Sequence, residues 1–339
     1  MRWRRHGGLL SCAVMGTPAY LDTARDFYRD AAVTPNPGLC CTTNPVWALP
    51  ELVVPPRMVE MNYGCGATVH PRDLVDQPTV IYVGVGGGLE LLQFAYFCRR
   101  PGAVIGIEPV AEMRLAARAN LAAAARSNAW FREEFVEIRE GDALALPVQD
   151  ASVGVAAQNC LFNVFQDAEL RRALAEVHRV LCPHGRFVLS DPVTPARLPQ
   201  AIAADDRLRA MCLSGAITYD DYIRRLVETG FGTIEVRARR PYRVLDPARF
   251  AVSAPVLLES IDVAAIKDPI PADGPCVFTG RTAIFFGDED AFDDRGGHVM
   301  VRDQPFAVCD KTAAALTALG RADLLVTAPT WFYDGGGCC

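Results

Sequence analysis

Short apolar runs rich in β-branched residues alternate with segments of helical spacing along much of the chain. The clearest run, Val80–Val83, meets the glycine-rich turn Gly84–Gly88, and Leu89–Ala95 follows with the apolar spacing of a helix. Strand, turn and helix in this order predict an α/β unit. Four further runs predict strands of the same sheet, at residues 103–107, 136–138, 153–158 and 186–191, with a crossover helix at 169–181.

The glycine turn predicts a ligand site. Glycines let the backbone approach a ligand closely, and the helix that follows offers unpaired N–H groups. Leu89 stands where a strict G-x-G-x-x-G dinucleotide fingerprint needs its last glycine. Gly84 and Gly86 therefore favour a smaller adenosine ligand over a dinucleotide.

Two acids and an amide follow the next strands. Glu108 ends the second strand, about 20 residues past the glycines, where an acid can bind ribose hydroxyls. Asp142, after the third strand, is expected to face an adenine amino group. The fourth strand leads to Asn159 and Cys160, where the chemistry of an α/β site belongs. This order resembles the S-adenosylmethionine-dependent methyltransferases of the Rossmann-like class. The alternative is an ordinary α/β layer with turn glycines and surface acids.

The remaining segments suggest how the chain is divided. A helix is predicted at 22–30, the chain is expected to leave the sheet at Pro192, and a helix at 219–229 closes on Gly230. Strands are predicted at 233–238 and 277–286, the second broken at residues 279–281. The predicted fold is an α/β Rossmann-like methyltransferase sheet with a smaller C-terminal α+β lobe. The expected divisions are 1–60 for a leader, helix and cysteine loop, 61–200 for the cofactor-binding domain, and 201–339 for the lobe.

The composition limits the kinds of partner that the protein is expected to bind. The 339 residues carry a net charge of −6 and only two lysines, which argues against binding nucleic acid. No run reaches the roughly 18 apolar residues of a membrane helix. The apolar part of the first 16 residues is short and broken by Gly and Ser, so they are interpreted as a disordered leader or a misassigned start. A cytoplasmic protein is expected.

The chain has 12 cysteines, which are not arranged as Cys-x-x-Cys pairs. A cytoplasmic protein keeps its thiols reduced, so thiolate chemistry or soft-metal binding is favoured over a structural zinc site. Cys40 and Cys65 lie on predicted loops, the second expected to be flexible. Cys160 and Cys212 would converge if the lobe folded over the sheet edge, and thiolates suit a soft trivalent acceptor.

Five motifs in one order resemble the arsenite S-adenosylmethionine methyltransferases, most closely their bacterial arsenosugar-associated branch. The resemblance runs from about Asp22 to the end of the chain. The motifs are Cys40-Cys41-Thr42-Thr43, Asn62-Tyr63-Gly64-Cys65-Gly66, Gln158-Asn159-Cys160, Met211-Cys212-Leu213-Ser214-Gly215-Ala216 and the terminal Gly-Gly-Cys-Cys.

The resemblance implies roles for single residues. Cys160 and Cys212 match the two cysteines that hold As(III), while Cys65 and Cys40 match relay thiols. Tyr63 matches an aromatic residue near the sulfonium. The implied cofactor residues are Gly84, Gly86, Glu108, Asp142 and Asn159. The implied reaction gives mono- and dimethylated arsenic, with glutathione or thioredoxin as reductant and a radical S-adenosylmethionine enzyme as a downstream partner.

The chain departs from the family pattern at one motif, and two alternative functions stay open. The family carries an acid at the end of its first strand, within Asp-Leu-Gly-x-Gly, where this chain has Tyr82-Val83-Gly84. A methyltransferase of an organic acceptor would instead need a general base, for example His178 or Asp191. A metalloid-binding protein would bind As(III) without turnover. The tail residues Cys338 and Cys339 have no assigned role.

Overall fold

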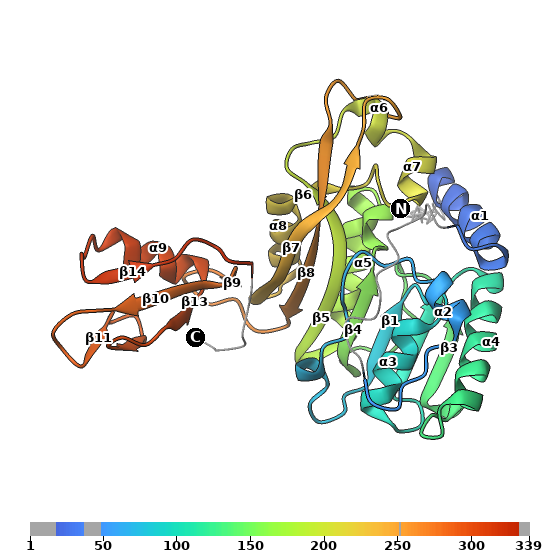
Figure 1. Ribbon diagram of the computed structural model, residues 1–339, viewed down its shortest axis with the longest axis horizontal. Helices are drawn as coiled ribbons and strands as arrows, with labels where there is room; N and C mark the ends of the chain where they lie inside the picture. The colour runs from blue at the N-terminus through green and yellow to red at the C-terminus, as the bar shows by residue number, and fades with distance from the viewer. Residues whose placement is uncertain (1–17, 37–48, 251, 332–339) are drawn as a thin grey trace, which may run out of the picture.

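Strand β1 (Val80–Val83) lies in the middle of a parallel sheet (Figure 1). The computed structural model describes residues 18–36, 49–250 and 252–331. The other parallel strands are β2 (Val104–Glu108), β3 (Val136–Glu140), β4 (Val153–Asn159) and β5 (Leu181–Thr194). They follow the order β3-β2-β1-β4-β5, so the carboxyl ends of the strands reach one edge. The predicted α/β sheet is confirmed.

Helices cover both faces of this sheet. Ile81 and Val83 pack into the core beneath α5 (Asp167–Val180), while Val80 and Tyr82 pack into the core beneath α3 (Leu89–Cys98). Successive residues of a strand point to opposite faces, which is why both are apolar. The remaining helical segments before β5 are α1 (Ala19–Val33), α2 (Pro56–Glu60), α4 (Ala111–Ser127) and the 3-10 turns η1 (Pro71–Leu74), η2 (Glu133–Phe135) and η3 (Phe162–Val164).

The sheet continues beyond β5 through antiparallel strands. β8 (Val256–Ile266) pairs with β5 from Arg186 to Val193, and β7 (Thr233–Leu245) pairs with β8. The predicted exit from the sheet at Pro192 is wrong, because β8 supplies a neighbour on that side and proline removes only one donor. The predicted division at residue 200 therefore separates strands that one hydrogen-bonded sheet joins.

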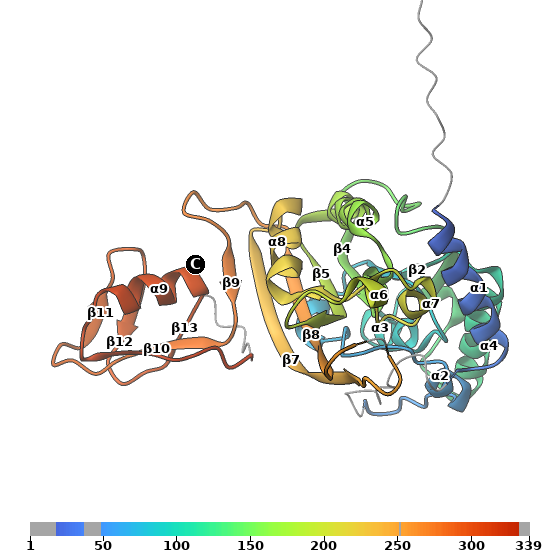
Figure 2. The same cartoon turned by 90° about the horizontal axis from the view of Figure 1, so that it is seen from above.

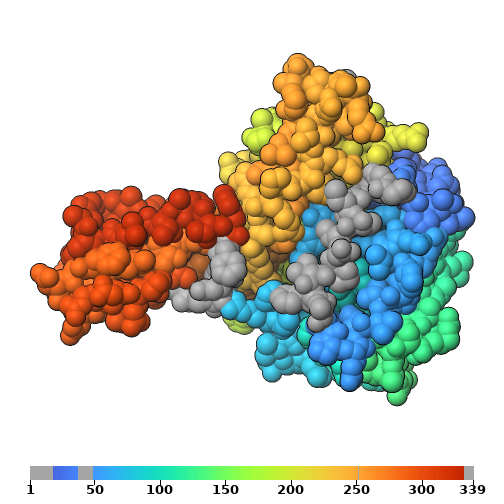
Figure 3. Space-filling view, in the orientation of Figure 1, coloured from blue at the N-terminus to red at the C-terminus, as the bar shows by residue number. Residues whose placement is uncertain are grey.

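Short helices and a small β-rich module complete the fold. The helix predicted at 219–229 is confirmed as α8 (Tyr219–Thr229), which ends at Gly230 with φ of 114°. The β-rich module of residues 281–326 has its own small core and stands out from the main body (Figures 2 and 3). Between β5 and α8 lie α6 (Gln200–Ala203), α7 (Asp206–Ala210) and β6 (Ile217–Thr218), and the later elements are β9 (Cys276–Phe278), β10 (Arg281–Phe285), β11 (Ala291–Asp293), β12 (Val299–Val301), β13 (Phe306–Val308), α9 (Asp310–Ala318) and β14 (Leu324–Val326).

A buried ion pair fixes η1 to the extended sheet. The carboxylate of Asp73 accepts hydrogen bonds from Arg186 of β5 at 2.8 Å and from both terminal nitrogens of Arg237 of β7. Burial by itself would raise the pKa of Asp73, but the two guanidinium groups hold it below its usual value. Asp73 thus joins the segment before β1 to strands on the far side of β4.

In the described ranges, none of the helices combines the length and the apolar character that a membrane crossing requires.

Candidate active site

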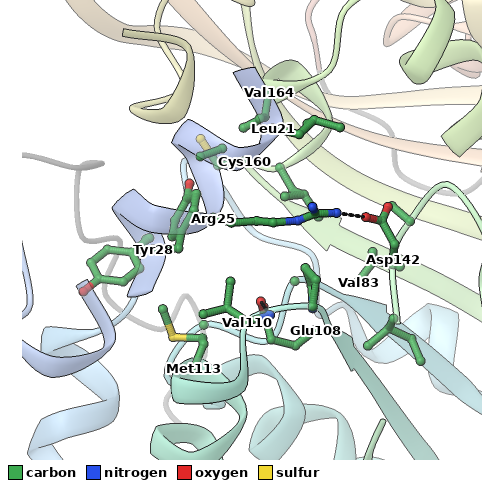
Figure 4. A pocket seen from close by; sticks show the side chains of 18 of the residues that line it. Leu21, Arg25, Tyr28, Val83, Glu108, Val110, Met113, Asp142, Cys160 and Val164 are labelled. Carbon is green, nitrogen blue, oxygen red and sulfur yellow. Dashed lines mark hydrogen bonds and ion pairs between the residues drawn. The ribbon is translucent and has the colours of Figure 1, made fainter. Parts of the chain in front are cut away.

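A pocket opens at the carboxyl ends of β1, β2 and β4 (Figure 4). Parallel sheets place ligands at this edge. Its walls are mostly apolar, from Val83 and Ile107 at the strand ends and from Val110 and Met113 at the start of α4. Four residues of α1 close another side, Leu21, Ala24, Arg25 and Tyr28.

The glycine turn forms one wall of this pocket. Gly84 and Gly86 line it with φ of 81° and 48°, backbone conformations that strongly favour glycine. Gly88, with φ of 87°, precedes the first residue of α3 and makes no side-chain cap. The glycine turn thus lines the pocket through Gly84 and Gly86, just before α3 begins.

Glu108 is buried at the end of β2 and also lines the pocket. Its carboxylate accepts backbone N–H groups from Val85 at 3.2 Å and from Val110 at 2.9 Å. Burial raises the pKa of Glu108 to about 7, although these two hydrogen bonds and Arg114 oppose the rise. A carboxylate held at this depth beside apolar walls suits paired ribose hydroxyls.

Asp142 lines the pocket from the loop after β3, the strand next to β2. One of its oxygens accepts from the backbone N–H of Leu144 at 2.9 Å, and the other accepts from Arg25 of α1 at 3.0 Å (Figure 4). The ion pair ties α1 to the loop after β3. The predicted contact of Asp142 with an adenine amino group would thus be made beside Arg25.

Cys160 and Cys212 meet above the end of β4. The Cys212 thiol donates a hydrogen bond to the carbonyl oxygen of Cys160 at 2.7 Å, and both side chains are buried. Each residue has a backbone φ of 58°, in the left-handed region that residues other than glycine rarely adopt. Such strained residues concentrate at functional sites, so this pair marks a candidate reaction centre.

The Cys65 turn packs tightly against the sheet. A Cβ added to Gly64 would lie 2.3 Å from the Asn159 amide nitrogen, and one added to Gly66 would lie 2.0 Å from a carboxylate oxygen of Asp262. The Cys65 side chain is 3% exposed, and its sulfur lies 3.4 Å from the Ser190 hydroxyl. The predicted flexible loop is therefore wrong: the glycines allow close packing and not mobility.

Two aromatic residues border the pocket near the cysteines. Tyr63, which the resemblance assigns to the surroundings of the sulfonium, lines the pocket, and its hydroxyl donates to the carbonyl of Ala31 at 3.3 Å. Tyr28, predicted only as a helix anchor, lies with its hydroxyl 3.6 Å from the sulfur of Cys212. Leu21, Ala24, Arg25 and Tyr28 are spaced so that they share one face of a helix. This spacing was the sequence signal that could have predicted a common role for this face of α1.

The Asn159 side chain binds protein groups. Its carbonyl oxygen accepts the backbone N–H of Cys65 at 2.9 Å, and its amide nitrogen donates to Gly66 O and to Glu90, each at 3.0 Å. Asn159 lines the pocket, but these contacts leave its amide no donor for a cofactor. Glu90, which the sequence did not single out, is partly buried in the first turn of α3.

The other sequence candidates lie elsewhere. His178 packs edge-on against Phe231 and does not line the pocket. Asp191 is buried behind the strand ends, where it accepts hydrogen bonds from Gln158 and Tyr222. No disulfide joins the cysteines of the described ranges. The remaining thiol candidates, Cys40, Cys41, Cys338 and Cys339, fall outside the described residues.

Comparisons with known proteins agree with this geometry. Residues 81–189 match the family described as methyltransferase domain. The chain is 34% identical over 177 residues to an arsenite methyltransferase of Halobacterium salinarum, covering 52% of this chain and 43% of that protein. It is 30% identical over 216 residues to an arsenite methyltransferase of Aquipseudomonas alcaligenes, covering 62% and 60%. The chain thus spans less than two thirds of either relative.

A solved structure supports the fold. An arsenic(III) S-adenosylmethionine methyltransferase from Chlamydomonas reinhardtii superimposes with a TM-score of 0.59 at 22% identity, covering 86% of this chain and 99% of that one. The predicted Rossmann-like class I fold is confirmed. Residues 81–189 thus match the methyltransferase domain family, and the chain is similar over 177 and 216 residues to two arsenite methyltransferases.

Proposed function

We propose that this chain transfers methyl groups from S-adenosylmethionine to trivalent arsenic held by cysteine thiolates. The observation that carries the proposal is the meeting of Cys160 and Cys212, two buried cysteines with left-handed backbones, where the Cys212 thiol reaches the Cys160 carbonyl oxygen beside the pocket. Two thiolates from separate segments suit a soft trivalent centre. The related arsenite methyltransferases support the same acceptor.

The pocket fits the cofactor by its own residues. Gly84 and Gly86 let the backbone approach the ligand, Glu108 presents a carboxylate to ribose hydroxyls, and Asp142 borders the adenine end. Val110 and Met113 supply apolar walls for the base. When bound, S-adenosylmethionine supplies an electrophilic methyl group.

The cysteines hold the substrate. Each bond from a thiol sulfur to arsenite releases one water, formed from the thiol proton and an arsenic hydroxide. Bound in this way, arsenic keeps its lone pair for the incoming methyl group, so no general base is required. The enzyme's work is then to orient the acceptor and to exclude water, which the burial of Cys160 and Cys212 favours.

The proposal extends to the thiol chemistry around the reaction. Cys65 supplies a third thiolate, Cys40 serves as a relay thiol, and glutathione or thioredoxin restores reduced arsenic between steps. The proposal takes the protein to be cytoplasmic, because the cytoplasm keeps thiols reduced. Mono- and dimethylated arsenic are the products, and a radical S-adenosylmethionine enzyme of arsenosugar synthesis is the consumer that the resemblance implies.

The test is a single-turnover assay. Purified protein is mixed with methyl-labelled S-adenosylmethionine, arsenite and excess glutathione, and the arsenic species are separated and counted. Label in monomethylated arsenic is the expected first product, with dimethylated arsenic after longer times. Cofactor binding with no labelled arsenic would overturn the proposal, and arsenite binding in the same sample would then identify a binding protein.

Cofactor affinity is expected to rise with pH. The pKa of Glu108 is raised to about 7 by burial, and ribose hydroxyls that donate to its carboxylate favour the ionised form. At pH 6 only about one tenth of Glu108 is ionised, so the dissociation constant of S-adenosylmethionine should be roughly tenfold higher than at pH 8. Equilibrium dialysis over this range measures it. Glu108→Gln should bind weakly with no such slope, and an unchanged slope in that variant would exclude Glu108 as the cause.

A further inference from the structure

The Asn159 amide connects the two cysteine-bearing segments. Asn159 directly precedes Cys160, and its amide bridges the backbone of the Cys65 turn through Cys65 N–H and Gly66 O. The close approach of Gly64 to this amide leaves it little room to move. The position of Cys65 relative to Cys160 therefore depends on the orientation of one amide group.

Glu90 reinforces the orientation that Cys65 N–H and Gly66 O favour. The amide nitrogen of Asn159 carries two N–H groups, one used by Gly66 O and the other by the Glu90 carboxylate at 3.0 Å. A rotated amide would point its oxygen at both acceptors and its N–H groups at the Cys65 N–H. With Glu90 present, only one orientation satisfies all three neighbours, and the contact to a carboxylate is the stronger kind of hydrogen bond.

Glu90 also links this amide to the cofactor side of the pocket. It lies in the first turn of α3, two residues after Gly88. The Tyr82 side chain, near the end of β1, lies against the same carboxylate. One carboxylate thus connects the end of β1, the glycine turn and, through Asn159, the Cys65 turn.

We propose that Glu90 is a positioning residue that acts through Asn159 to hold the Cys65 turn beside Cys160. The proposal rests on the proposed function, in which Cys65 supplies a thiolate to arsenic. Glu90 itself does not line the pocket. Losing it should therefore resemble losing Cys65 and should leave cofactor binding unchanged.

The test compares Glu90→Ala with Glu90→Gln, which keeps an acceptor for the Asn159 amide. In arsenic-free protein, the alkylation rate of Cys65 by iodoacetamide, read peptide by peptide, should rise on the order of tenfold in Glu90→Ala, the effect of one lost hydrogen bond to a charged group. The Cys160 rate and the S-adenosylmethionine affinity should not change. Glu90→Gln should restore most of the protection. Glu112→Ala, which removes a carboxylate from the first turn of α4, is the matched control.

A double-mutant cycle gives the decisive comparison. Arsenic methylation in Glu90→Ala should fall to the level of Cys65→Ser, and adding Glu90→Ala to Cys65→Ser should cost nothing more. Losses that multiply, or a cofactor affinity that falls with Glu90→Ala in both backgrounds, would overturn the proposal. If Glu90→Ala fails to fold, Asn159→Asp replaces it, because that change removes the donors to Glu90 and Gly66 O at constant size. If wild-type protein methylates no arsenic, the alkylation rates still decide the role of Glu90.

Discussion

Replacing either Cys160 or Cys212 by serine is expected to reduce arsenic methylation about a thousandfold or more, since residues that act as a unit lose nearly all activity when one is removed. A serine hydroxyl is similar in size but does not bind As(III) as a thiolate does. The double variant should be no slower than either single one. Single-turnover transfer of labelled methyl groups measures all three.

Cofactor binding separates this result from simple unfolding. Both variants should bind S-adenosylmethionine with wild-type affinity, because neither sulfur is needed to hold the ribose or the base. Cys182→Ser, which changes a partly exposed cysteine on β5 whose thiol donates to Ala151 O, is the matched control and should retain full activity. Retained methylation in Cys160→Ser or Cys212→Ser would exclude a dithiolate acceptor site.

Asp73→Asn is expected to lower the free energy of unfolding by about 3–5 kcal/mol, the usual cost of removing one partner from a buried ion pair. The Asp73 side chain is 1% exposed and pairs with both Arg186 and Arg237. Without the carboxylate, Arg186 loses its ion pair with Asp73, and Arg237 keeps its ion pair with Glu235 but loses the one with Asp73. Urea unfolding at neutral pH measures the change through the transition midpoint.

Lowering the pH should abolish the stabilisation by Asp73 in the wild-type protein. The pKa of Asp73 in the folded state lies below its usual value, so its stabilisation is complete above about pH 4, the pKa of a free Asp, and is lost as the pH falls through the folded pKa. Asp73→Asn should lack this part of the acid transition. The exposed Asp76, changed to Asn, is the control. Equal losses in both variants would contradict the role assigned to the buried pair.

Strands and helices that show their type through a local pattern of apolar residues were predictable from the sequence. β1 is apolar on both faces, and α8 ends at a glycine, so each shows its type within its own residues. α4 is rich in alanine and arginine and lacks a marked apolar stripe. β8 was missed because Glu259 and Asp262 interrupt its apolar run. Those acids pair with Arg239 and Arg240 of β7, and only the tertiary fold brings these partners together.

The candidate site was partly predictable for the same reason. Gly84, Glu108 and Asp142 follow strand ends, and a parallel sheet brings strand ends together whatever the loops do. The roles of Glu90, Arg25 and Tyr28 depend on where α3 and α1 pack, which no local pattern determines. Asn159 lies at the predicted edge, yet its amide binds the Cys65 turn because Gly64 and Gly66 allow that turn to come so close.

The pairing of β8 with β5 restricts how this chain can be shortened or recombined during evolution. Strand β5 is hydrogen bonded on both sides, to β4 and from Arg186 to Val193 also to β8. A chain ending near residue 200 would expose that side of β5 as a long, largely apolar edge with unpaired N–H and C=O groups, a template for aggregation. A shortened chain that keeps β5 must therefore also keep β8 to cover this edge.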